Sequence, residues 1–161
     1  MRQIVKWIVR VLLAVLGLAV VLVSVLYFTG RARFQRQFTQ VQAEVVSIPS
    51  DPESLAVGQK WAETLCTNCH APDLSGRPLI EDDSLGVIGS PNLTAGAGGI
   101  GTAYTDLDWV RALRHGIGLD NTTLMGMPSD AFYYLSDQDL GALIAYLKSV
   151  PPVDHEAAPT Q

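Results

Sequence analysis

Cysteine is scarce in this chain of 161 residues, which contains only Cys66 and Cys69. A disulfide framework and a four-cysteine zinc site both need more thiols than this, so both are excluded. Histidine does not complete a zinc site either, because His115 and His155 are isolated and far from the two cysteines in the sequence. The cysteine pair must therefore be interpreted together with the residues beside it.

Acidic residues are absent from the first 43 positions, and all sixteen of them lie later in the chain. The N-terminal region carries six basic residues and a formal charge of +6, whereas the remainder carries −11. Such an acidic domain repels nucleic acid and anionic lipid. We therefore exclude nucleic acid as a partner. The same charge keeps a domain soluble or steers it toward a basic protein surface, and composition does not separate these two roles.

Charged residues are also missing between positions 11 and 29. An apolar helix of this length spans about 30 Å, enough for the hydrocarbon core of a bilayer. A cleaved signal peptide is the alternative, but this run exceeds a typical signal core and no small-x-small cleavage site follows it. The sequence predicts a transmembrane anchor at residues 1–30, bound to the lipid membrane.

The segment Cys66-Thr67-Asn68-Cys69-His70 places an imidazole directly after two closely spaced thiols. This spacing is typical of c-type haem attachment, in which the thiols add to the porphyrin vinyl groups and the histidine binds the iron. A redox dithiol also uses this cysteine spacing but needs a preceding strand, whereas residues 54–65 are predicted to be helical. We expect one covalently bound haem c, held by Cys66, Cys69 and His70.

A second iron ligand is sought among the few remaining candidates. Met125 and Met127 lie in a short loop, and a thioether raises the reduction potential relative to a second imidazole. Pro128 stiffens the backbone after Met127, which favours Met127 as the ligand, with Met125 packing on the haem edge. His115, at a helix end, is the less favoured alternative.

Periodicity predicts helices and no strand, so the expected fold class is all-α. Ser54 caps a helix that runs to Leu65, Thr105 starts a second helix, and the residues from Ser136 cap a third. Gly58 lies inside the first helix, where glycine is costly, so we expect a close contact there. The glycine run at residues 96–101 lacks the strand of a nucleotide-binding motif and is expected to close around a flat cofactor.

The remaining segments are assigned as a linker, a domain and a tail. Residues 31–52 are predicted to continue the helix and then extend through prolines, which tethers the domain away from the bilayer. We expect Phe34, Phe38, Val41 and Val45 to form one apolar stripe on this helix, which packs either on a partner or on the domain itself. Residues 53–152 form the domain, and residues 153–161 a disordered tail.

Five segments together resemble a class I cytochrome c domain, and more narrowly the monohaem domains in cytochrome subunits of membrane-bound alcohol and aldehyde dehydrogenases. The resemblance covers about residues 53–152, and its segments are Cys66-x-x-Cys69-His70, Asn92-Leu93-Thr94, Trp109 to Arg114, Met127-Pro128 and Leu140 to Leu147. It implies helices packed around one covalent haem.

The resemblance also implies individual roles. Cys66 and Cys69 would form the thioethers, His70 would be the proximal ligand and Met127 the distal ligand. Gly58 and Tyr146 would mark the helix crossing of the family. A proline carbonyl steadies the proximal imidazole in relatives, and Pro78 is the candidate here.

Covalent haem is attached outside the bacterial cytoplasm, which sets a topology that the balanced flanking charges leave open. The expected protein is a single-pass protein of the inner membrane with a periplasmic haem domain. We expect an electron carrier rather than an enzyme, acting in a respiratory chain between a quinol-oxidising complex or dehydrogenase and a terminal oxidase, reductase or photosynthetic acceptor. The alternatives are a fixed subunit of a larger oxidoreductase and a haem gas sensor or peroxidase with an open iron.

Overall fold

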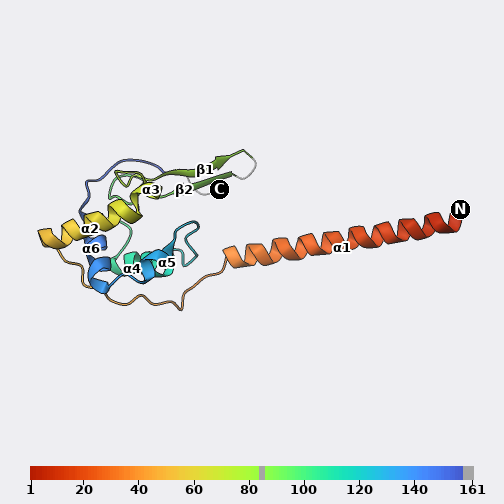
Figure 1. Ribbon diagram of the computed structural model, residues 1–161, viewed down its shortest axis with the longest axis horizontal. Helices are drawn as coiled ribbons and strands as arrows, with labels where there is room; N and C mark the ends of the chain where they lie inside the picture. The colour runs from red at the N-terminus through yellow and green to blue at the C-terminus, as the bar shows by residue number, and fades with distance from the viewer. Residues whose placement is uncertain (84–85, 158–161) are drawn as a thin grey trace.

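The computed structural model describes residues 1–83 and 86–157, apart from the side chain of Phe34. A long helix, α1 (Arg2–Phe34), leaves a mostly helical domain (Figure 1). The domain contains α2 (Pro52–Leu65), α3 (Thr67–His70), β1 (Arg77–Asp82), β2 (Gly86–Ser90), α4 (Asp106–His115), α5 (Ser129–Tyr133) and α6 (Asp137–Ser149).

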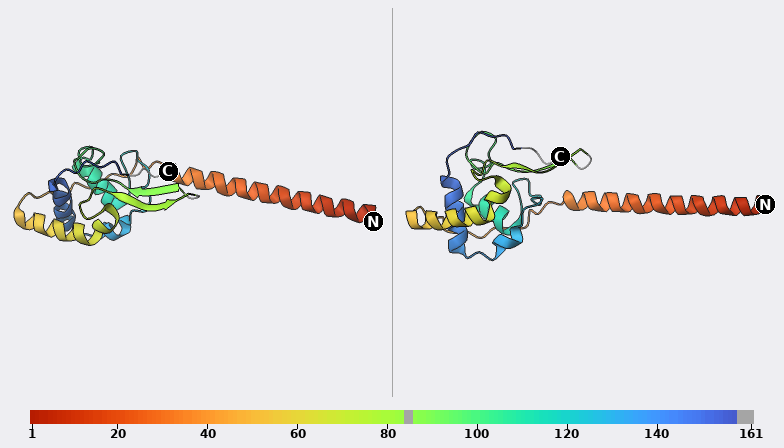
Figure 2. Two further views of the ribbon diagram at one scale, coloured as in Figure 1. Left: turned by 90° about the horizontal axis from the view of Figure 1, so that it is seen from above. Right: turned by 45° about the horizontal axis from the view of Figure 1, so that its top comes forward.

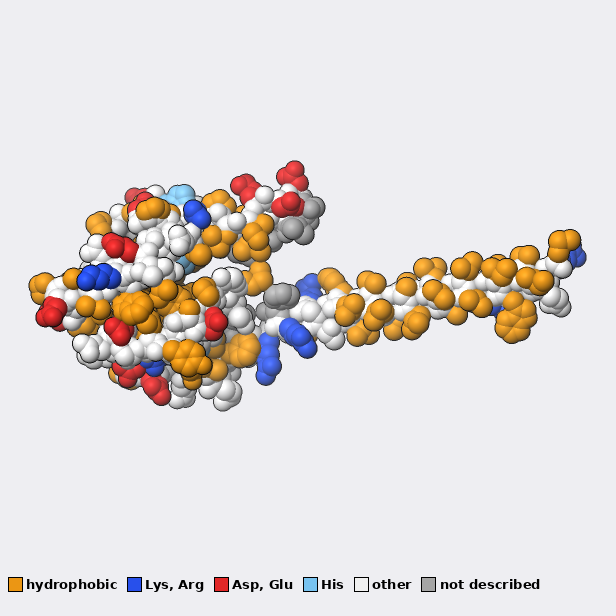
Figure 3. All heavy atoms as spheres, in the orientation of Figure 1, with side chains coloured by type: hydrophobic (Ala, Val, Ile, Leu, Met, Phe, Trp, Pro, Cys, Tyr) orange, Lys and Arg blue, Asp and Glu red, His pale blue; other side chains and the backbone are white. Residues whose placement is uncertain are grey.

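Helix α1 is long and apolar enough to cross a membrane, and none of its apolar stretch is buried against the domain. Its side chains present an almost continuous hydrophobic surface (Figure 3). A signal sequence near an N-terminus has the same length and composition. The helix therefore fits either a membrane anchor or a signal sequence.

The centre of the domain is the crossing of α2 and α6, which contribute Ala62, Leu140, Leu143 and Ile144 to the core. The two backbones approach closely at Gly58, where an added Cβ would lie 2.0 Å from the Ala142 carbonyl oxygen. The same atom would lie 2.8 Å from Cβ of Tyr146. The close contact expected at Gly58 is thus confirmed, and only glycine fits it.

The helix boundaries follow their capping residues. Helix α2 begins earlier than predicted, because Asp51 rather than Ser54 is its N-cap and accepts the Ser54 N–H at 2.9 Å. Thr105 and Asp108 form a capping box at α4, and Ser136 caps α6, as the sequence predicts.

A β-hairpin was not predicted, and it corrects the strictly all-α expectation. Strands β1 and β2 pair antiparallel from Arg77↔Ser90 to Asp82↔Gly86, with an irregularity after Pro78. The prediction failed because β1 is exposed along its whole length, so it shows no alternation of buried and exposed residues, and its second residue is a proline. The hairpin projects from the domain on the same side as α1 (Figure 2).

The linker after α1 is docked on the domain, so the predicted free tether is wrong. The helix ends at Phe34, and residues 35–51 run along the domain without regular structure. The Phe38 N–H donates to the Asn121 carbonyl at 2.8 Å, and Val46 is only 7% exposed. Val45 is exposed, and the Phe34 side chain lies outside the described residues, so the predicted helical stripe does not form.

The first residues of the predicted tail, beginning with Val153, are held on the domain and are not disordered. The Val153 N–H donates to Thr94 Oγ1 at 2.9 Å, and the Val153 carbonyl accepts from Asn92 Nδ2 at 2.7 Å. Gly96 packs on Val153 so closely that an added Cβ would lie 2.1 Å from its carbonyl oxygen. Gly96 and Gly98 of the glycine run therefore pack on this segment, and residues 158–161 lie outside the described residues.

We expect Gly58→Ala to destabilise the haem domain by about 1–3 kcal/mol, because the added methyl overpacks the α2–α6 crossing. The measurement is guanidinium unfolding of the full-length protein in detergent, followed by the absorbance of the haem domain. Gly17→Ala in α1, where nothing lies within 4 Å, is the matched control. Equal unfolding midpoints for both variants would contradict the tight crossing.

Candidate haem-binding site

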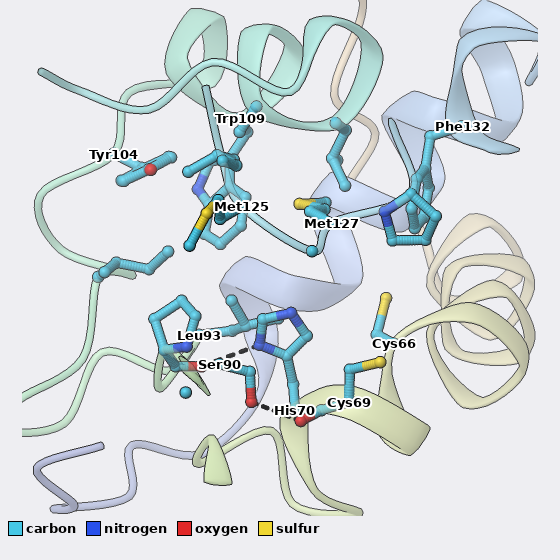
Figure 4. Close-up of a pocket in the computed structure, with 18 of the residues that line it drawn as sticks. Cys66, Cys69, His70, Ser90, Leu93, Tyr104, Trp109, Met125, Met127 and Phe132 are labelled. Atoms are coloured by element: carbon cyan, nitrogen blue, oxygen red, sulfur yellow. Dashed lines mark hydrogen bonds between the residues drawn. The ribbon is translucent and has the colours of Figure 1, made fainter. Parts of the chain in front are cut away.

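The motif residues occupy the junction of α2 and α3. The Cys66 N–H donates to the Ala62 carbonyl at 2.8 Å, and the Cys66 carbonyl accepts from His70 N–H at 2.9 Å. One compact turn therefore follows the end of α2. It directs Cys66, Cys69 and His70 toward one cavity (Figure 4).

The cavity has a volume of about 640 Å³ and mostly apolar walls. Leu93, Ile100, Leu113, Phe132 and Leu147 are among the lining residues. Asp120 is the carboxylate among the lining residues, and none of the described lining residues is lysine or arginine. Such a cavity suits a large, flat, apolar group with few polar atoms.

The His70 ring is oriented by the Pro91 carbonyl, which lies 2.9 Å from Nδ1. A carbonyl only accepts, so Nδ1 carries the proton and the Nε2 lone pair remains free for a metal. Burial lowers the pKa of His70, and the bond to Pro91 acts in the opposite direction. The carbonyl belongs to Pro91 at the end of the hairpin, so the assignment of Pro78 is wrong.

Ser90 joins the hairpin to the motif, and sequence reasoning missed it. Its buried hydroxyl donates to the Cys69 carbonyl and accepts the Arg77 N–H at 3.1 Å. This places Pro91, the next residue, beside the imidazole. The adjacency of Ser90 and Pro91 to the Asn92-Leu93-Thr94 segment was the available signal.

Both candidate methionines lie across the cavity from His70 (Figure 4). Met125 is 46% exposed, whereas Met127 packs against the hydrophobic core. Gly126 lies between them and has a left-handed φ of 76°, which residues other than glycine rarely adopt. His115 lies apart from the cavity lining, with its ring 6.4 Å from that of Tyr133.

Backbone pairing holds the segment from Gly116 to Pro128, called here the methionine loop. The Leu124 N–H donates to the Gly116 carbonyl at 2.7 Å, and Ile117 bridges Thr123. Gly116 has a left-handed φ of 63° at the C-terminus of α4. The chain thereby reverses after α4 and returns to the cavity.

The environment of Cys66 argues against a reactive dithiol. Burial, together with a smaller effect of the neighbouring Cys69, raises the pKa of Cys66 to about 12. A redox-active cysteine has a lowered pKa, because the thiolate is the nucleophile. Among the described residues there is also no cluster of three His, Cys, Asp or Glu side chains for a metal ion.

One buried polar atom tests whether a haem fits. The Trp109 side chain lines the cavity and is 2% exposed, yet its Nε1–H has no hydrogen-bond partner. A buried donor of this kind costs free energy unless the cavity's occupant accepts from it. Nearby, burial raises the pKa of Tyr104, and Asp108 and Asp120 add to this effect, so its phenol stays neutral.

The residues therefore fit a haem on four counts. Two thiols and an imidazole lie on one wall, two methionine thioethers lie opposite them, and the remaining walls are apolar. The fourth point is the buried indole N–H of Trp109, which has no hydrogen-bond partner in the protein. A porphyrin carries carboxylates that can accept from Trp109.

Comparison with known proteins agrees with this site. The family model for cytochrome c matches residues 55–151. The fructose dehydrogenase cytochrome subunit of Gluconobacter japonicus is 38% identical over 103 residues, which make up 60% of this chain and 21% of that protein. This chain thus corresponds to about a fifth of that relative. The chain belongs to the cytochrome c family, with a class I c-type cytochrome domain that makes it a haem protein of electron transfer.

Proposed function

We propose that the chain is a membrane-anchored monohaem c-type cytochrome that passes single electrons. It takes them from a quinol-oxidising complex or a dehydrogenase and delivers them to a terminal acceptor. The haem iron supplies the one-electron chemistry when bound. The protein holds the iron ligands, excludes water from the cavity and does no bond chemistry itself.

The observation that carries this proposal is the opposition of His70 and Met127 across an apolar cavity. Cys66 and Cys69 would form the thioethers, and His70 and Met127 would hold the iron from opposite sides of the cavity. Because Nδ1 donates to the Pro91 carbonyl, Nε2 of His70 would be free to bind the iron. A haem held by both side chains would have no open iron position, which suits a carrier and does not suit a gas sensor or peroxidase.

Met127 is proposed over Met125 because of its surroundings. Met127 packs on the core, so its thioether is held in place, whereas Met125 is largely exposed. Pro128 follows Met127 directly and restricts the backbone there.

The anchor and the location follow from α1. We propose that α1 remains attached and spans the inner membrane, with the haem domain on the periplasmic side. One cysteine pair supports one haem, because the chain has no further thiols. The flanking arginines Arg31 and Arg33 then lie at the periplasmic headgroups.

A fixed subunit of a larger oxidoreductase is the second candidate. The relative's description as a dehydrogenase cytochrome subunit favours it. The two candidates share the haem site and differ in whether the chain keeps one partner.

We expect Met127→Leu to lower the reduction potential and to abolish the far-red charge-transfer band of a methionine-ligated ferric haem, because the iron loses its thioether. The measurement is a visible spectrum with redox titration of the full-length protein. Met125→Leu is the control and should keep the band. An unchanged band in Met127→Leu would refute this ligand, and carbon monoxide binding by the reduced wild type would favour an open iron.

We expect Trp109→Phe to lower the reduction potential, because a haem carboxylate loses a donor that offsets its negative charge. Redox titration measures this shift. Trp61→Phe is the matched control, since Trp61 Nε1 donates to Asp139 at 3.1 Å, outside the cavity lining. Equal potentials for Trp109→Phe and the wild type would show that the indole does not serve the haem.

Purification in a mild detergent separates the two candidate functions. The carrier is expected to elute without a stoichiometric partner, because its contacts with donor and acceptor are transient. The measurement is size-exclusion chromatography with mass spectrometry of the haem-containing fraction. A second chain at a constant ratio would contradict the carrier and favour the subunit.

A further inference from the structure

The end of α1 is tied closely to the methionine loop. Only three residues lie between Phe34, the last residue of α1, and Phe38, so the four Cα–Cα steps limit the distance between their Cα atoms to about 14 Å. The Phe38 N–H then donates to the Asn121 carbonyl at 2.8 Å. The end of α1 therefore lies near Asn121 whichever direction the helix takes.

This attachment is reinforced from α4. One Arg111 guanidinium nitrogen, Nη2, donates to the Phe38 carbonyl at 2.9 Å and to Asn121 Oδ1 at 2.6 Å. The same arginine therefore holds the linker and the methionine loop together. Two bonds from a charged donor are stronger than neutral ones.

The rest of the linker is fixed as well. Val46 is buried in the core, and the Ser47 carbonyl would lie 2.1 Å from a Cβ added at Gly141. The Glu44 carboxylate oxygen Oε2 lies 3.9 Å from Nη1 of Arg114. The domain is thus joined to α1 by a short segment, residues 35–37, and not by a long flexible tether.

The mouth of the cavity lies on the same loop. Asp120 and Thr122, on either side of Asn121, line the cavity, and the exposed lining residues include Leu79, Thr123 and Met125. Figure 3 shows the hollow between the hairpin and the methionine loop on the side from which α1 leaves. A spanning α1 therefore brings the mouth close to the membrane surface.

Charge indicates what covers this mouth. Arg31, Arg33 and Arg36 suit anionic lipid headgroups at the end of α1. The lining of the mouth instead includes Asp120 and, among the described residues, no lysine or arginine. The hairpin exposes three acidic residues, Glu81, Asp82 and Asp83, against one basic residue, Arg77, so its charge is also net negative. Anionic lipid is repelled by such a rim, whereas a protein surface with basic side chains is attracted.

We propose that the docked linker holds the cavity mouth at the membrane surface, where it receives a redox protein embedded in the same membrane with a basic docking face. This inference rests on the proposed function, because it needs α1 to remain as an anchor and the cavity to hold haem. Electrons then pass between this chain and its partner while both proteins remain in the membrane.

The test is an insertion of eight Gly and Ser residues between Arg36 and Gln37, which adds roughly 25 Å of reach. The full-length protein is placed in vesicles of phosphatidylcholine and phosphatidylglycerol that carry a headgroup fluorophore, which haem quenches by energy transfer. We expect the insertion to reduce the quenching several-fold. Unchanged quenching would overturn the proposed placement.

A second measurement tests the partner. In native membranes given a short-chain ubiquinol, we expect the insertion to slow haem reduction several-fold and to leave oxidation by ferricyanide unchanged. An unchanged reduction rate would show a donor that reaches the haem from solution, which overturns the proposal. The control carries the same eight residues after Gln161 and should match the wild type.

Failure of the proposed function gives different signals. Absent covalent haem appears in the pyridine haemochrome spectrum of the wild type, and a cleaved α1 appears as protein released from washed membranes. Both are measured before the insertion is compared.

Discussion

The hydrogen bond from His70 Nδ1 to the Pro91 carbonyl is the interaction on which the site depends. It fixes the tautomer and direction of the imidazole and thereby aims Nε2 across the cavity. It also connects the turn after α2 to the end of the hairpin, with Ser90 bonded to the Cys69 carbonyl beside it. One wall of the cavity is thus a single hydrogen-bonded unit.

The opposite wall depends on a chain reversal, backbone hydrogen bonds and core packing. Gly116 turns the chain at the end of α4, backbone pairing closes the loop, and the core holds Met127. Between the walls, the α2–α6 crossing at Gly58 fixes the helices that carry them. With haem bound as proposed, a rigid frame of this kind would limit movement of the iron ligands when the iron changes charge, which favours electron transfer.

The sequence predicted those parts that depend on local spacing. The haem motif, the caps at Thr105 and Ser136 and the close contact at Gly58 are all encoded within a few residues. Long-range partners were not predictable in this way. Pro91 was missed because its carbonyl meets His70 from 21 residues away, and the linker was misjudged because Val46 and Ser47 dock on α6 rather than on their neighbours.

Nuclear magnetic resonance of the reduced full-length protein in detergent tests the central claim most directly. A methionine bound to a haem iron has its methyl protons shifted far upfield by the ring current of the porphyrin. The account predicts one such three-proton signal, which disappears in Met127→Leu and persists in Met125→Leu. A reduced protein without this signal, whether its iron is bound by two histidines or left open, would contradict the proposed opposition of His70 and Met127.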